Sequence, residues 1–307
     1  MSRLLAVDWG SSSLRGALLD EHGAALEERA FPRGILTVDA GAFPEVFNSC
    51  FGDWMTPGTL CLISGMAGSK QGWREAPYCA CPAGFDAIAA ALEWVEPGRI
   101  AIVPGLSIDK DGVPDVMRGE ETQIFGALQL LGLDHARLVL PGTHSKWVSV
   151  TDRKVTDFST WMTGEFYALL RRHSILARML PEDEPALDSA AFDRGVAHAL
   201  AGPGLLNTAF STRTLSLFNR MGTEALPSYL SGLVIGEELK SQTLPRGEPV
   251  VVMASAQLFA EGDKRTRFVW ITDVLPDALE GYIDAMMTQG GAVMQRTLSG
   301  SLQKPAG

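Results

Sequence analysis

Two short turns rich in glycine and hydroxyl residues, each between runs typical of β-strands, constrain this chain most. The first turn, residues 10–13, follows an apolar run that ends near Asp8. The second, residues 142–145, follows an apolar run and is followed by Lys146 and a further apolar run. Hydroxyls and exposed backbone N–H groups in a tight turn suit phosphate oxygens, because several donors converge without a bulky side chain in the way. Both turns are therefore predicted to bind phosphate.

Length and charge limit the class of protein. The chain has 307 residues, 46% of them hydrophobic, so it can build large cores and exceeds the usual size of a single domain. We expect two domains, residues 1–112 and 113–307, with the last segment packing back on the first. The net charge of −10 argues against a nucleic-acid or membrane-surface partner, since both favour a basic face.

The remaining bulk features are those of a cytoplasmic protein. The four cysteines, Cys50, Cys61, Cys79 and Cys81, lack the spacing of a metal site and are expected to be reduced thiols. The first residues lead directly into a strand without the pattern of a signal peptide, and no apolar run approaches the length of a membrane span.

Strands that end at glycine-rich loops alternate with helices along the chain, which predicts an α/β fold with function at the strand ends. Besides the two hairpins, the expected strands are 24–29, 60–63, 100–103 and 250–256. The expected helices are 41–54, 85–94, 119–131 and a mostly helical stretch from 163 to 238. A polar turn at 109–115 is read as an excursion or a domain junction. The plan of hairpin, helix and strand recurs in each half, which indicates a duplicated architecture.

Several segments together give a specific resemblance. They are residues 7–15 (VDWGSSSLR), 64–69 (SGMAGS), 72–73, 76–78, 104–106, 116–123 (VMRGEETQ), 141–148 (PGTHSKWV), 162–165 (MTGE) and 230–237 (LSGLVIGE). In these residues the chain resembles the 2-dehydro-3-deoxygalactonokinases, members of the actin/hexokinase/Hsp70 superfamily. Their order and spacing hold from residue 4 to about residue 260; the tail follows the family only loosely.

The resemblance implies two actin-like ATPase (ribonuclease H-like) domains around a deep cleft that holds ATP and Mg²⁺. The implied reaction, a step of D-galactonate catabolism, phosphorylates the 6-hydroxyl of 2-dehydro-3-deoxy-D-galactonate by in-line transfer. The residues expected to contact the ATP phosphates are Asp8, Gly10, Ser11, Ser12, Ser13, Gly142, Thr143, His144 and Ser145. Asp8 is also the expected Mg²⁺ ligand, while His144 could equally be a structural histidine.

The expected catalytic groups are Glu120, Glu121 and Lys146. Two acids in the first turn of a helix could simply complement its dipole. In related sugar kinases, however, a Gly-Asp pair opens the corresponding helix and the Asp is the base, which Gly119 and Glu120 resemble. Glu121 remains the alternative base. Lys146 would neutralise charge on the transferred phosphoryl group.

Substrate and nucleoside contacts complete the expected site. A guanidinium can bind the planar carboxylate of a 2-oxo acid through two parallel bonds, which favours Arg118. The expected substrate-binding residues are Arg15, Ser69, Trp73, Arg118, Thr163 and Glu165. The expected nucleoside-binding residues are Gly232, Gly236 and Ser255, although the two glycines could serve close helix packing instead.

Three alternatives stay open on the sequence alone. The chain could be a kinase of the same fold for a different sugar or sugar acid. It could be a non-catalytic, ATP-binding regulatory protein, although the acid at 120 and the cations at 118 and 146 argue against this. An acetate-kinase-like phosphotransferase is a third and weaker alternative. The stereochemistry of the substrate and a homodimeric state are not fixed by the sequence.

Overall fold

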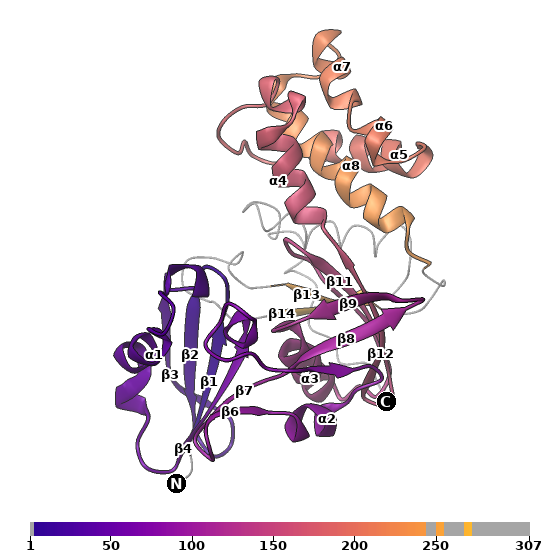
Figure 1. The fold of residues 1–307 in the computed structure, drawn as a ribbon. Helices are drawn as coiled ribbons and strands as arrows, with labels where there is room; N and C mark the ends of the chain where they lie inside the picture. Colours follow the sequence, from indigo (N-terminus) through magenta and orange to yellow (C-terminus); the bar gives the residue numbers. More distant parts are fainter. Residues whose placement is uncertain (1–2, 244–249, 255–266, 272–307) are drawn as a thin grey trace. The chain divides into compact units, whose positions relative to one another are not determined.

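The structure, a computed structural model, describes residues 3–243, 250–254 and 267–271 (Figure 1). Its internal contacts divide the chain into two compact units. The first unit contains residues 1–135 and 149–158, and the second contains residues 136–148 and 159–307. The short segment 149–158 groups with the first unit because Ala83 and Val155 exchange backbone hydrogen bonds of 3.1 and 2.9 Å.

The first unit is built on a six-stranded sheet with the strand order β3-β2-β1-β4-β7-β6. Its strands are β1 (Arg3–Trp9), β2 (Leu14–Leu19), β3 (Ala25–Phe31), β4 (Thr59–Gly65), β6 (Glu93–Glu96) and β7 (Ile100–Ile102). Strand β1 runs antiparallel to β2 and parallel to β4, so the predicted first hairpin leads into a central parallel pair. The predicted strands near 24–29, 60–63 and 100–103 are confirmed.

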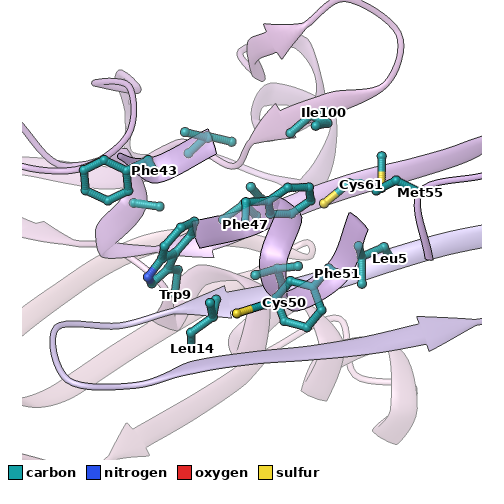
Figure 2. Close-up of a cluster of buried hydrophobic side chains, with 14 of the residues drawn as sticks. Leu5, Trp9, Leu14, Phe43, Phe47, Cys50, Phe51, Met55, Cys61 and Ile100 are labelled. Atoms are coloured by element: carbon teal, nitrogen blue, oxygen red, sulfur yellow. The ribbon is translucent and has the colours of Figure 1, made fainter. Parts of the chain in front are cut away.

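Helix α1 (Phe43–Phe51) forms the main core of the first unit against this sheet. Its apolar residues recur at helical spacing, so Phe43, Phe47 and Phe51 lie on one buried face. Figure 2 shows these rings with Trp9 and Cys61 in one cluster. Burying each large side chain stabilises the fold by about 1.5–3 kcal/mol. This packing holds the end of β1 in place.

The helix predicted for 85–94 is shorter than expected. Helix α2 ends at Ala90 (Phe85–Ala90), and residues Glu93–Glu96 form β6 instead. Strand β6 pairs antiparallel with β7, Trp94 lying opposite Ala101. The apolar spacing of this segment fits either element, and pairing with the sheet edge decided between them.

The polar turn at 109–115 proves to lie inside a β-hairpin. Strands β8 (Gly105–Lys110) and β9 (Val113–Met117) pair antiparallel, and the Gly112 amide donates to the Asp109 carboxylate at 2.8 Å. With β5 (Tyr78–Ala80) they form a three-stranded sheet. Helix α3 (Glu120–Leu131) follows in the same unit, whose first segment continues to His135; the predicted boundary at 112 stays a prediction.

A second sheet repeats the plan of the first. Its strand order is β12-β11-β10-β13-β14, from β10 (Ala136–Leu140), β11 (Ser145–Thr151), β12 (Lys154–Trp161), β13 (Val250–Ala254) and β14 (Arg267–Ile271). As in the first sheet, three consecutive strands lie side by side, and the first of them runs parallel to a later strand, here β13. The predicted duplication of architecture is confirmed.

A group of helices lies between β12 and β13 in the sequence (Figure 1). They are α4 (Thr163–His173), α5 (Ser189–Ala201), α6 (Leu205–Thr208), α7 (Ser211–Leu217) and α8 (Leu226–Lys240). Single 3₁₀ turns occur at Ile35–Thr37, Gly52–Trp54, Met66–Gly68, Ile175–Arg178 and Thr223–Ala225. Within the described ranges, no helix has the length and apolar character that crossing a membrane requires.

Candidate active site

The first predicted phosphate turn is tight and is held by hydrogen bonds from a neighbouring segment. The Gly10 amide donates to the Ser13 carbonyl at 2.9 Å, while the carbonyls of Gly10 and Ser11 accept from Ile35 and Leu36 at 3.0 and 3.2 Å. The carbonyls of Gly10, Ser11 and Ser13 are thereby occupied. Among the described residues, the three serine amides of the turn donate to no protein acceptor. The turn therefore presents free donors, as a phosphate-binding loop requires.

Gly34 allows this segment to approach the turn, a role that the sequence did not indicate. A Cβ at Gly34 would lie 2.1 Å from the Ser11 carbonyl oxygen, so the segment can approach the turn only with glycine there. The position carries no local signal, because the close approach joins residues more than twenty positions apart.

Asp8 lies at the end of β1, where it can meet a cation. It is solvent-accessible and pairs across the sheet with Arg15 on β2 and with Ser64 on β4. Desolvation by the surrounding protein raises the pKa of Asp8, and the Arg15 charge opposes this shift. A bound divalent cation would stabilise the charged carboxylate further.

Two glycines bring the start of α3 to the end of the central strands. Gly65 ends β4 with φ +91°, and a Cβ there would lie 2.9 Å from the Trp9 carbonyl and 3.2 Å from the Asp8 carboxylate. Gly119 precedes α3 with φ +105°, and its Cβ would lie 3.3 Å from the Cα of Gly65. Asp8 and the first residues of α3 are thus neighbours across Gly65.

The two glutamates that begin α3 have different environments. Glu120 is half-buried, and its Oε2 accepts from the Arg118 amide at 3.1 Å. Glu121 is fully buried, its Oε2 accepts from the Gly119 amide at 2.6 Å, and burial raises its pKa to about 8. A general base must reach the proton that it removes. Accessibility therefore favours Glu120 over Glu121 for that role.

Arg118 is held by the protein on one side and has unused donors on the other. Its Nη2 donates to the Ala76 carbonyl at 2.7 Å, and the guanidinium stacks 4.3 Å from the centre of the Tyr78 ring. In the part of the chain that the structure describes, Nε and Nη1 are buried without a hydrogen-bond partner, and so is the Ser69 hydroxyl. Gly68 lies against the guanidinium, since a Cβ there would be 2.5 Å from Nη1. Unpaired buried donors are costly, so this group suits an anionic ligand.

Trp73, another expected substrate residue, belongs mainly to the core. Its ring meets Trp9 at 6.1 Å in an edge-on arrangement and Phe47 at 5.4 Å. It is only partly buried, so some of its surface remains accessible.

The second predicted phosphate turn is attached to the start of α4. The Glu165 amide donates to the Thr143 carbonyl at 3.1 Å, and the Glu165 carboxylate lies 2.5 Å from His144 Nε2. A Cβ at Gly164 would lie 2.7 Å from the Gly142 carbonyl, which makes glycine necessary for this approach. The side chains of Thr143 and His144 remain exposed. The second turn and the first residues of α4 are thus in direct contact.

Two hydroxyls expected to face ligands are directed inward instead. Ser145 and Thr163 are buried, and both donate to the carboxylate of Glu238, which the sequence analysis did not single out. Their hydroxyls therefore have a structural role in this structure, because each proton is already engaged with a buried acceptor. Lys146 is buried in β11 with a relative exposure of 5%, so its expected contact with phosphate remains a prediction.

The expected nucleoside residues are the least supported. Gly232 and Gly236 lie at the contact of α8 with α5, where a Cβ would be 2.2 Å from the Phe192 carbonyl and 2.8 Å from the Ala199 side chain. Close helix packing explains both glycines. Ser255 lies outside the described residues.

The described acidic side chains were considered as ligands for the Mg²⁺ that the sequence analysis expects. Within the described segments, no three His, Cys, Asp or Glu side chains gather as they would around a resident metal ion. Asp8 is an accessible carboxylate beside the unpaired amides of the first turn, a chemistry that suits Mg²⁺. Phosphate oxygens and water would supply its other ligands.

Two sheets with the same strand plan, each with a glycine–hydroxyl turn after its first strand, form an α/β protein, and the family that its sequence matches is one of kinases. Such a protein uses ATP. The chain belongs to the 2-keto-3-deoxy-galactonokinase family, whose model matches residues 8–266.

Individual relatives agree with this assignment. The chain is 38% identical over 240 residues to the Escherichia coli K12 protein named 2-dehydro-3-deoxygalactonokinase, covering 78% of this chain and 80% of that one. It is 40% identical over 240 residues to a Rhizobium meliloti protein named as a probable 2-dehydro-3-deoxygalactonokinase DgoK1, covering 76% and 78%. A crystal structure from Sinorhizobium meliloti, described as a candidate 2-dehydro-3-deoxygalactonokinase, matches with a TM-score of 0.74 and 37% identity over 80% of this chain and 84% of that one.

Proposed function

We propose that this chain transfers the γ-phosphoryl group of ATP to the 6-hydroxyl of 2-dehydro-3-deoxy-D-galactonate, giving the 6-phosphate and ADP. Family membership across residues 8–266 supports the substrate. The observation that supports the chemistry is that Gly65 lies close both to Asp8 and to Gly119, which precedes α3. An accessible carboxylate beside free amides and a second carboxylate on a helix start are the groups that a phosphoryl transfer to an alcohol requires.

In the proposed reaction Glu120 is the general base. Its carboxylate accepts the proton of the 6-hydroxyl while that oxygen forms a bond to the γ-phosphorus and the bond to the β-bridging oxygen breaks. The Arg118 amide, which donates to Glu120 Oε2, would hold the carboxylate in orientation. Such a positioned base contributes on the order of 10²–10⁴ to the rate.

The phosphates are proposed to be bound by both glycine–hydroxyl turns. The free serine amides of residues 10–13 and the exposed turn at 142–144 supply donors, and Lys146 supplies positive charge. Mg²⁺, when bound near Asp8, would neutralise charge on the phosphates. Arg118 and Ser69 carry buried donors without partners among the described residues, and they are proposed to bind the substrate carboxylate.

The test is a coupled assay of ADP release with ATP and a panel of sugar acids. We expect the highest kcat/KM for 2-dehydro-3-deoxy-D-galactonate, ahead of its epimers and of aldonic acids without the 2-oxo group. A higher kcat/KM for another sugar acid would reassign the substrate. ATP binding without turnover of any sugar acid would overturn the kinase proposal and favour a regulatory role.

A further inference from the structure

The buried carboxylate of Glu238 gathers three donors from two different elements. Glu238 lies on α8 with a relative exposure of 2%. Its Oε1 accepts from the Ser145 hydroxyl and from the Trp147 indole N–H, both at 2.7 Å. Its Oε2 accepts from the Thr163 hydroxyl. Hydrogen bonds to an ionised acceptor are the strong ones in proteins, and burial strengthens them further.

Two of these donors come from the second phosphate turn and from the helix that the turn contacts. Ser145 ends the turn and begins β11, while Thr163 is the first residue of α4. On the exposed side, the turn and α4 are already joined through Thr143, His144 and Glu165. Glu238 joins them again from the buried side. The turn is therefore held against α4 from two directions.

Glutamate has a particular advantage at this position. A carboxylate offers about four acceptor sites on two oxygens, enough for the hydroxyls of Ser145 and Thr163 and the donor-only indole of Trp147. An apolar residue of similar size would leave these buried donors without their acceptor. Loss of the carboxylate should therefore loosen the turn, because each donor would seek another partner.

We propose that Glu238 is a positioning residue for ATP, which fixes the second phosphate turn in its binding conformation without touching the ligand. The inference rests on the proposed function in one respect: the turn at 142–145 binds phosphate of ATP. It does not depend on which alcohol accepts the phosphoryl group.

The experiment compares Glu238→Ala with Val234→Ala in the full chain. Val234 is buried one turn away on the same helix, in an apolar cluster with Leu176 and Leu230. Its side chain can form no hydrogen bond, so its truncation is the control for lost packing near Glu238. ATP affinity is measured by calorimetry, and thermal unfolding is recorded for each variant. We expect the Kd for ATP to rise about tenfold or more in Glu238→Ala and to change less than twofold in Val234→Ala.

A conservative variant separates hydrogen bonding from charge. In Glu238→Gln the amide oxygen can accept from Ser145 and Trp147, and the amide NH₂ can donate to the Thr163 hydroxyl. We expect its Kd for ATP to stay within about threefold of the wild type. If Glu238→Ala does not fold, the double variant Ser145→Ala/Thr163→Val removes the two hydroxyl donors to the carboxylate and should also weaken ATP binding about tenfold.

Two outcomes would overturn the inference. One is an ATP affinity in Glu238→Ala, or in the double variant, equal to that of Val234→Ala. The other is a Gln variant as weak as the Ala variant, since that would assign the effect to charge. Failure of the proposed function has a different signature: wild-type protein that binds ATP but phosphorylates no sugar acid.

Discussion

A Cβ on Gly119 would lie 3.3 Å from the Cα of Gly65, so these two glycines seat the start of α3 directly on the end of β4. Both have positive φ, which L side chains rarely adopt. The contact matters because Asp8 lies on the other side of Gly65 and Glu120 follows Gly119. Because Gly65 and Gly119 have no side chains, the segments that carry Asp8 and Glu120 can approach each other here although they are distant in the sequence.

Replacing Gly65 should cost more than replacing a glycine of similar conformation in open space. Gly65→Ala and Gly58→Ala both place alanine at φ near +90°, which costs on the order of 1–3 kcal/mol. At Gly65 the new Cβ also overlaps the Trp9 carbonyl, while at Gly58 no atom of the described residues lies within 4 Å of the new Cβ. We expect Gly65→Ala to lose at least roughly 1 kcal/mol more in urea unfolding than Gly58→Ala. Equal losses would show that the strand end can move aside.

Burial of Glu121 should make stability fall with rising pH. Its pKa is about 8 in the folded protein against an ordinary value of 4.5, so the folded state binds more protons than the unfolded state between these values. The unfolding free energy therefore declines from about pH 4.5 to pH 8, by up to a few kcal/mol from this group. Glu121→Gln should remove this decline.

The measurement is urea unfolding of wild type and Glu121→Gln at pH 5 and pH 8.5, compared as a difference. The control is Glu45→Gln, an exposed glutamate in the first turn of α1, which should keep the wild-type pH profile. A Glu121→Gln profile parallel to the wild type would refute the prediction.

Glu120→Gln should lower kcat about 10²–10⁴-fold, because the amide cannot accept the proton of the substrate hydroxyl. The KM for ATP should change only a few-fold, since the amide oxygen can still accept from the Arg118 amide. Steady-state kinetics with both substrates varied provide the check. Glu121→Gln, which removes a fully buried acid, should reduce kcat less; the reverse order would exchange the two roles.

Arg118→Met should raise the KM for the sugar acid roughly 10–100-fold, the expected loss for a charged hydrogen bond to a carboxylate. The KM for ATP should be much less affected. Thermal unfolding is needed alongside, because Arg118 also binds the Ala76 carbonyl. Arg99→Gln, at an exposed arginine of the same unit, is the control. A rise in the KM for ATP alone would move Arg118 from the sugar acid to the phosphates.

Asp8→Asn should raise the Mg²⁺ concentration needed for half-maximal turnover by about tenfold, because a neutral amide is a weaker ligand than a carboxylate. Chelation of divalent cations should abolish wild-type activity, and added Mg²⁺ should restore it. Asp39→Asn, at an exposed aspartate of the same unit, should behave as wild type. An unchanged Mg²⁺ dependence in Asp8→Asn would remove Asp8 as the ligand.

Local patterns were sufficient for most elements and for the candidate phosphate turns. The first hairpin, α1 and α3 follow from apolar spacing and from glycines at turns, all read within a few residues. Residues 93–96 could not be assigned in this way, because an edge strand and a helix end share the same local pattern. The turn at 109–115 left an excursion and a domain junction open for a similar reason, because a polar turn occurs in both; the structure shows a hairpin of β8 and β9 there.

Only the tertiary structure could distinguish neighbouring residues of like chemistry. The amino-acid sequence determined which acids, cations and hydroxyls stand beside the glycine turns, because these are properties of adjacent residues. Burial and long-range hydrogen bonding then separated accessible Glu120 from buried Glu121, and turned Ser145 and Thr163 toward Glu238. Such choices depend on atoms brought together from distant positions of the chain, and no local pattern records them.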